Sequence, residues 1–165
     1  MQVGRNPTTG LVVDVFGPTV EFMLPLDEAR DSFCVLKGVI PPSGVVPLHS
    51  HPDIEDFVVI SGEMQLLRQG TDGHDWIVGK AGDYMHVPGG VPHAWRNVST
   101  EPVVALLFTT PRLGRFFQEA GRPATRALQH VTPEDLARFA AVSAEYGYWN
   151  ATPEENAAVG IRLGF

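Results

Sequence analysis

Cysteine and lysine are scarce in this chain of 165 residues. The single cysteine, Cys34, excludes an intrachain disulfide and a zinc site of the Cys-x-x-Cys kind. Such cysteine poverty is typical of a reducing compartment, so we expect a cytoplasmic protein. Only Lys37 and Lys80 are lysines, and 12 basic residues oppose 19 acidic ones, for a net charge of −7. Without a basic run, the chain lacks the surface that binds nucleic acid or an anionic membrane.

Long apolar runs are missing as well. No stretch approaches the roughly 20 apolar residues of a transmembrane helix. Residues 1–7 lack the basic and then apolar pattern of a signal peptide. The composition, 44% hydrophobic and 19% charged, is that of a globular domain with a real core. We therefore expect a soluble protein whose partner is a small molecule.

Glycine (17) and proline (14) are frequent, and they separate short segments with strand character. No helical period interrupts these segments between residues 11 and 110. The segments are residues 11–16, 20–24, 33–40, 45–51, 55–60, 64–68, 76–78, 84–87, 93–98 and 103–109. Many short strands joined by turns predict an all-β protein, an antiparallel sandwich or barrel.

The last third of the chain has a helical period instead. Thr132 and Thr152 each begin a Thr-Pro-Glu sequence, which is a helix start with an N-cap, a proline in the first turn and an acidic residue. We therefore divide the chain into an N-terminal strand or arm (1–19), a β-barrel (20–110) and a helical C-terminal extension (111–165).

Two of the six histidines, His49 and His51, lie two residues apart and shortly before Glu55, a spacing that can place metal-binding side chains together. Side chains alternate along a strand, so His49 and His51 point the same way, and Glu55 does too if the strand resumes in register. Two imidazoles and a carboxylate are costly to bury unpaired, and a divalent metal ion removes that cost. The same residues could also be two surface histidines near a surface glutamate, so this pattern alone leaves both interpretations open.

The surroundings of these residues favour the metal site. The segment from Gly44 through His49, His51 and Glu55 to Gly62 resembles the first motif of the cupin superfamily. Residues 82–97 match the second motif, G(x)5PxGxxHxxxN, in which the histidine is number 93. The sequence departs from the motif at one point: four residues, instead of five, separate Gly44 from His49, which affects the geometry of the local turn. The resemblance covers roughly residues 20–110.

The resemblance implies a double-stranded β-helix (jelly-roll) barrel with a short C-terminal helical appendage. It also implies one divalent transition metal per chain, iron, manganese, nickel, copper or zinc. The implied metal ligands are His49, His51, Glu55 and His93. A small single-domain chain of this kind is similar to the quercetin-dioxygenase-like cupins. Asn97, the last residue of the second motif, is expected to order the backbone.

Strand alternation also predicts the lining of a substrate pocket. Phe57 shares the inward side with Glu55, and Trp95 shares it with His93. Cys34 faces the interior from the segment 33–40. His86, in the strand 84–87, is a further pocket candidate, as a proton shuttle or as a support for a ligand. For all four, the alternative is a structural role: core packing, or for His86 a hydrogen-bonded structural histidine.

Three functions are compatible with this site. The one we favour is a dioxygenase-type oxidoreductase acting on a small apolar or aromatic oxygenated compound, such as a polyphenol, polyketide or diketone. Four protein ligands leave two positions on a six-coordinate ion, enough for substrate and oxygen, and Glu55 could serve as ligand, as general base or as both. The alternatives are a non-redox cyclase, lyase or isomerase and a non-catalytic small-molecule binder.

Small barrels of this kind have sheet edges and apolar outer faces that need covering. We therefore expect a homodimer. The segment 11–16 and the helical face formed by Leu136, Phe139 and Ala140 are the candidate surfaces. Each could pack on its own barrel or on that of a partner.

Overall fold

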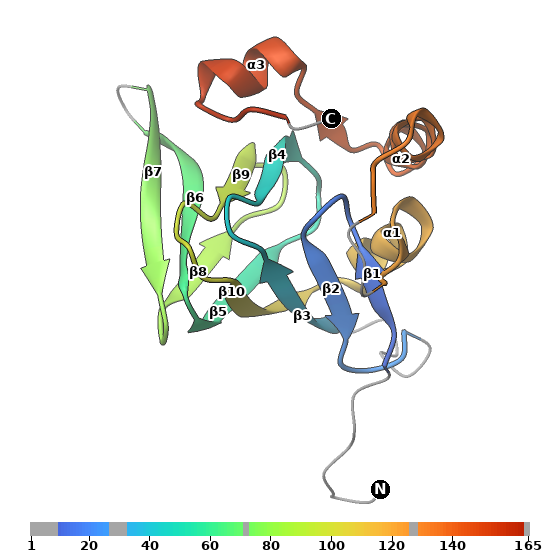
Figure 1. Ribbon diagram of the computed structural model, residues 1–165, viewed down its shortest axis with the longest axis horizontal. Helices are drawn as coiled ribbons and strands as arrows, with labels where there is room; N and C mark the ends of the chain where they lie inside the picture. The colour runs from blue at the N-terminus through green and yellow to red at the C-terminus, as the bar shows by residue number, and fades with distance from the viewer. Residues whose placement is uncertain (1–9, 27–32, 71–72, 126–128, 164–165) are drawn as a thin grey trace, which may run out of the picture.

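The computed structural model describes residues 10–26, 33–70, 73–125 and 129–163. Two antiparallel sheets form the body of the molecule (Figure 1). The seven-stranded sheet has the order β11-β1-β2-β3-β10-β5-β8, and the five-stranded sheet has the order β12-β4-β9-β6-β7. This is the jelly-roll architecture expected from the sequence.

The strands match the predicted segments closely. The first sheet contains β1 (Val12–Asp14), β2 (Thr19–Phe22), β3 (Cys34–Ile40), β5 (Glu55–Ser61), β8 (Tyr84–Val87), β10 (Val103–Thr109) and β11 (Arg122–Pro123). The second contains β4 (Val45–Ser50), β6 (Glu63–Gly70), β7 (Gly73–Lys80), β9 (His93–Arg96) and β12 (Trp149–Asn150). Sequence analysis missed β11 and β12, which are two residues each and come from the C-terminal extension.

Side chains alternate across β5 as the parity argument requires. Glu55, Phe57 and Val59 are buried, whereas Asp56 and Val58 are only partly so. Most buried apolar residues of the two sheets form one interior cluster, whose members include Phe22, Leu36, Phe57, Met64, Met85 and Trp95. A second cluster joins Leu48, Leu67 and Ala94 of the five-stranded sheet to Ile161. The core therefore lies between the sheets, and the predicted site residues of β5 face into it.

Asn97 orders the backbone at one end of the barrel. Its buried Nδ2 donates to the carbonyls of Ile40, Pro41 and Glu101. Its Oδ1 accepts from the backbone N–H and the hydroxyl of Ser99. One amide thus joins the ends of three segments, and the predicted structural role of Asn97 is confirmed.

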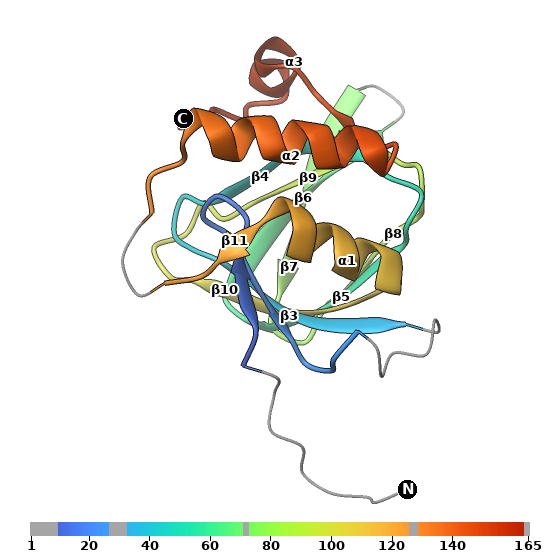
Figure 2. The ribbon, with the colours of Figure 1, turned by 90° about the vertical axis from the view of Figure 1, so that its right-hand side faces the viewer.

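Three helices follow the barrel: α1 (Pro111–Ala120), α2 (Pro133–Glu145) and α3 (Pro153–Ala158). Thr132 and Thr152 are N-caps as predicted, each in a capping box. Helices α1 and α2 lie side by side along one side of the barrel (Figure 2). Within the residues described, no helix combines the length and the apolar run needed to span a bilayer.

The predicted apolar face of α2 is divided between the interior and the surface. Phe139 and Val142 pack beside the buried residues of α1, Ser143 is buried, and α2 also contacts β12. Leu136 and Ala140 are exposed, so packing of this part of the face on a partner stays a prediction.

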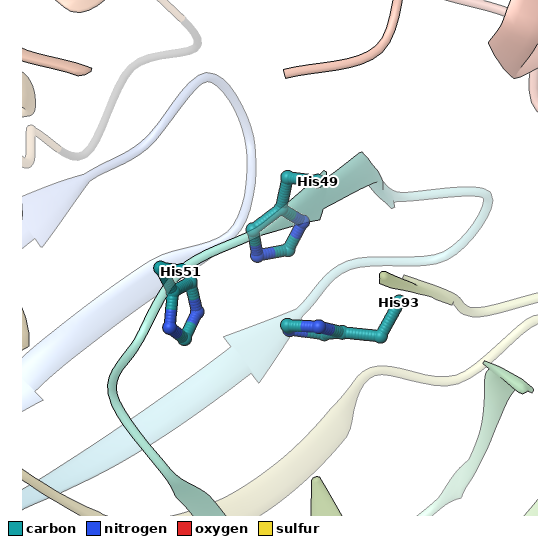
Figure 3. A group of neighbouring side chains, drawn as sticks. All are labelled: His49, His51 and His93. Atoms are coloured by element: carbon teal, nitrogen blue, oxygen red, sulfur yellow. The ribbon is translucent and has the colours of Figure 1, made fainter. Parts of the chain in front are cut away.

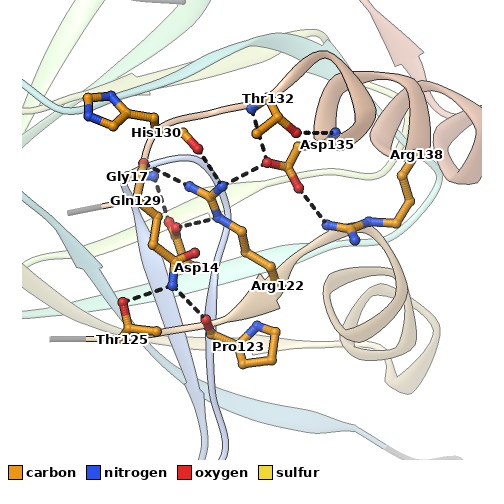
Figure 4. Close-up of polar contacts among 10 residues, drawn as sticks. All are labelled: Asp14, Gly17, Arg122, Pro123, Thr125, Gln129, His130, Thr132, Asp135 and Arg138. Atoms are coloured by element: carbon orange, nitrogen blue, oxygen red, sulfur yellow. Dashed lines mark hydrogen bonds and ion pairs between the residues drawn. The ribbon is translucent and has the colours of Figure 1, made fainter. Parts of the chain in front are cut away.

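Arg122 links the C-terminal extension to the first strand by hydrogen bonds and ion pairs (Figure 4). Its guanidinium contacts Asp14 Oδ2 at 2.9 Å and Asp135 Oδ2 at 2.8 Å, and it donates to the carbonyls of Gln129 and His130. The β1 strand itself pairs with β2 and β11. The segment 11–16 therefore packs on its own barrel, which was one of the two packing options that the sequence left open.

Candidate metal centre

Three histidines from neighbouring strands converge inside the barrel (Figure 3). His49 lies near the end of β4 and pairs in register with His93, the first residue of β9. His51 follows β4 by one residue. One ring nitrogen of each histidine lies within 4.8 Å of the others. The ring centroids of His49 and His93 are 4.2 Å apart, and each lies just over 5 Å from that of His51.

The backbone fixes how each imidazole is oriented. His49 Nδ1 lies 2.7 Å from the carbonyl of Pro47, and His93 Nδ1 lies 2.8 Å from that of Val91. His51 Nδ1 lies 3.0 Å from the carbonyl of Asp53. A carbonyl can only accept, so each Nδ1 carries the proton and donates it. In a neutral ring, Nε2 is then the atom with the free lone pair, as a metal ligand requires.

Glu55, the first residue of β5, adds a carboxylate to the cluster. Its Oε2 lies 3.1 Å from His93 Nε2, and its Oε1 lies 3.7 Å from His51 Nε2. Burial alone would raise the pKa of Glu55, but its contacts with His51 and His93 outweigh burial and hold the pKa well below the usual range. The carboxylate is therefore ionised at neutral pH.

The histidines differ in their electrostatic surroundings. Burial, reinforced by the neighbouring His93, lowers the pKa of His49 to about 3, so this ring is neutral. Burial is the largest influence on His93 and disfavours its charge, but the hydrogen bond and charge of Glu55 and the carbonyl of Val91 together outweigh burial and raise the pKa of His93. In the absence of an ion, the raised pKa of His93 and the lowered pKa of Glu55 both favour a proton on His93 beside the carboxylate, 3.1 Å away.

The donor set fits a divalent transition metal. His51 Nε2 is buried and has no hydrogen-bond partner among the residues that the structure describes, which is costly unless something else binds it. Imidazole nitrogens with one or more carboxylate oxygens suit iron, manganese, nickel, copper and zinc. An ion bound among the three Nε2 atoms would satisfy His51 and would replace the proton shared by His93 and Glu55.

Phe57 and Trp95, two of the predicted pocket residues, lie together in the interior. Their ring centroids are 4.3 Å apart, and both side chains are buried. The indole N–H of Trp95 has no hydrogen-bond partner. Cys34 is buried in the same apolar cluster, close to Gly114 of α1, and burial raises the pKa of its thiol to about 11. A role in substrate binding stays a prediction for these three residues.

His86 does not line the interior, and its predicted place in the pocket is wrong. On β8, Met85 and Val87 are buried, whereas His86 is exposed on the opposite face. There its Nδ1 lies 2.6 Å from Asp56 Oδ1, which also accepts from the hydroxyl of Tyr84. His86 is thus an outer-face hydrogen-bonded histidine, because its parity in β8 is that of the exposed residues.

Sequence analysis missed two residues beside the histidines, Tyr148 and Asp53. Tyr148, from the C-terminal extension, lies with its ring centroid 5.1 Å from that of His51. Its hydroxyl donates to Asp53 Oδ2 at 2.5 Å. Burial and this hydrogen bond raise the pKa of Tyr148, so it stays a phenol. No pattern marks a residue 95 positions from its partner, so only the tertiary structure shows this contact.

Comparisons with known proteins agree with this architecture. Comparison with curated protein sequences gave no match. Among solved structures, a predicted oxalate decarboxylase from Thermotoga maritima is similar, with TM-score 0.52, 19% identity, and coverage of 63% of this chain and 96% of that chain. The cupin domain of Schizosaccharomyces pombe Cnp3 is similar with TM-score 0.51, 15% identity, and coverage of 61% and 69%.

Oxalate decarboxylase from Bacillus subtilis, a protein with Mn(II) centres, is similar with TM-score 0.52 and 22% identity. The alignment covers 61% of this chain but only 27% of that chain. At such identities these likenesses show the fold alone. The family described as Cupin domain matches residues 36–109, which include the three histidines and Glu55. The match and the fold together support a likeness of residues 36–109 to the cupin superfamily, and these residues, under half of the chain, are called the cupin domain below.

Proposed function

We propose that the protein is a metal-dependent oxidoreductase of the dioxygenase type, acting on a small apolar or aromatic oxygenated compound. The observation that carries the proposal is the convergence of three oriented imidazoles on one buried carboxylate. Each of the three has its Nδ1 bound to a backbone carbonyl, so the site is preorganised for an ion and not for a hydrogen-bond network alone.

His49, His51 and His93 would hold the ion through Nε2, with Glu55 as the fourth ligand. When bound, a redox-active divalent ion would supply Lewis acidity and one-electron chemistry at the edge of the apolar interior. The remaining work belongs to the protein. Glu55 is ionised, as both a metal ligand and a general base must be.

The interior next to the site supports the choice of substrate class. Phe57 and Trp95 form an aromatic pair, and the surrounding cluster of the barrel is apolar. Such walls favour a flat apolar compound and exclude water from a reacting centre. The unpartnered indole N–H of Trp95 could donate to an oxygen of that compound.

Oxygen consumption tests the proposal. The iron-loaded and zinc-loaded proteins are assayed side by side against phenolic and diketone compounds, in air and in an anaerobic chamber. His93→Ala serves as the inactive variant. His74→Ala, which changes an exposed histidine of β7, is the matched control that keeps full activity.

We expect oxygen uptake and product formation with the iron form in air, the loss of both in the His93→Ala variant, and no product in the anaerobic chamber. Undiminished product formation by the zinc form without oxygen would overturn the proposal and favour a lyase, cyclase or isomerase. Binding of these compounds without any turnover, by every metal form, would favour a non-catalytic binder.

A further inference from the structure

Asp53 collects contacts from three residues that lie outside the cupin domain. Tyr148 donates its hydroxyl to Oδ2 at 2.5 Å, and Arg112 donates Nη1 to the same oxygen at 2.9 Å. The hydroxyl of Thr110, the N-cap of α1, donates to Oδ1. Both oxygens of a carboxylate that is only 5% exposed are thus occupied. A buried charge with a cation and two hydroxyl partners is held in one orientation.

The backbone of Asp53 is in turn a partner of the metal site. Its carbonyl accepts from His51 Nδ1. Asp53 lies in the connection between β4 and β5, where no strand ladder fixes it. By contrast, the carbonyl that accepts from His49 belongs to Pro47, inside β4. The acceptor for His51 therefore depends on the side chain of Asp53 and on what holds that side chain.

Tyr148 also contacts His51 directly, with ring centroids 5.1 Å apart. Contacts with α1 and α2 hold Tyr148 in this position. Its ring packs on Phe116 of α1 at 4.7 Å, and its backbone N–H donates to the carbonyl of Ser143 of α2. A single buried side chain thus contacts both the ring of His51 and the residue that orients that ring.

We propose that Tyr148 is a positioning residue for His51, so that the C-terminal extension completes the centre that the cupin domain holds. Tyr148 keeps Nδ1 of His51 as the donor and Nε2 as the free nitrogen. Its effect on metal affinity rests on the proposed function, because that effect requires His51 to be a ligand. Its effect on the imidazole itself does not.

The matched pair Tyr148→Phe and Tyr146→Phe tests this. Tyr146 comes from the same segment, and its hydroxyl donates to Glu119 and not to Asp53. Arg112 stacks over both rings, and phenylalanine preserves both stacks. Nitrogen NMR of the histidine rings reads the protonated nitrogen of each imidazole, in the full-length chain, metal-free and zinc-loaded. Competition with a chelator gives the zinc dissociation constant.

In metal-free Tyr148→Phe we expect the nitrogen NMR signals of the His51 ring to shift, while the signals of His49 and His93 stay unchanged. In Tyr146→Phe the signals of all three histidines should stay unchanged. Zinc should bind about tenfold more weakly to Tyr148→Phe than to the unaltered protein, as is usual when a residue that orients a metal ligand is changed. Tyr146→Phe should bind zinc as tightly as the unaltered protein. Asp53→Asn provides the same reading should Tyr148→Phe fail to fold.

Unchanged His51 signals in Tyr148→Phe would overturn the proposal. Equal shifts of all three histidines would do so too, because they indicate general loosening. If zinc leaves the His51 signals of the unaltered protein unchanged, the proposed metal site fails, whereas the metal-free comparison still decides the role of Tyr148.

Discussion

His49 should make the metal-free protein sensitive to mild acid. Its pKa falls from 6.5 in an unfolded chain to about 3 in the folded protein, because of burial and the nearby His93. Below pH 6.5 the unfolded chain therefore binds a proton that the folded protein excludes. The free energy of unfolding falls by up to 1.4 kcal/mol per pH unit, and it has lost about 3 kcal/mol by pH 4.5.

The window from pH 6 to 4.5 isolates this histidine from its neighbours. His93 has a raised pKa, so its stabilising contribution is complete below pH 6.5 and is lost only as the pH rises through its folded value. Glu55 has a lowered pKa, so its contribution is lost only as the pH falls below 4.5. Neither group contributes much slope between these limits.

Urea unfolding followed by circular dichroism, with a chelator present, measures the effect at three pH values between 6 and 4.5. The His49→Gln variant should lack most of the decline, because glutamine does not titrate. His74→Gln, at an exposed position, should decline as the unaltered protein does. Parallel declines in all three proteins would refute the assignment of a neutral ring to His49.

Three further outcomes follow from the contacts described. Asn97→Ala should lower the free energy of unfolding by about 3 kcal/mol, because it strips partners from buried backbone groups; a change below 1 kcal/mol in urea unfolding would contradict this. If the rings line the pocket, Phe57→Ala and Trp95→Ala should alter ligand preference while the metal content stays near normal. A fall of about 3 kcal/mol in the free energy of unfolding, with unchanged ligand preference, would make them core residues only. Zinc affinity should rise with pH up to the raised pKa of His93, because the ion displaces its proton, and pH-independent affinity in a chelator competition would refute that.

The sequence was sufficient for the barrel and for the cluster because both depend on local pattern. Alternation in β5 placed Glu55 and Phe57 inward, and glycine and proline marked the ends of most strands. The spacing of His49 and His51 put both imidazoles on one side, and the second motif supplied His93. The alternation and spacing inferences used residues close together in the chain, where strand geometry fixes direction, whereas the jelly-roll fold and the place of His93 in the cluster came from the resemblance to the cupin motifs.

The failures all needed tertiary information. His86 shares a strand with Met85, and the strand pattern Tyr-Met-His-Val does not say which side faces the core. The sequence left open whether the helix face with Leu136 packs on its own barrel or on a partner, because that depends on where α1 lies. Tyr148 and Asp53 are brought together only by packing of the extension on the barrel, which no local pattern encodes.

Metal analysis of the purified protein tests the central claim most directly. Elemental analysis after gel filtration should give one divalent transition metal ion per chain for the unaltered protein. The His49→Ala/His51→Ala double variant should contain little metal while circular dichroism shows an intact barrel, because the apolar core does not depend on the ion. Full metal occupancy in that folded double variant would contradict the account.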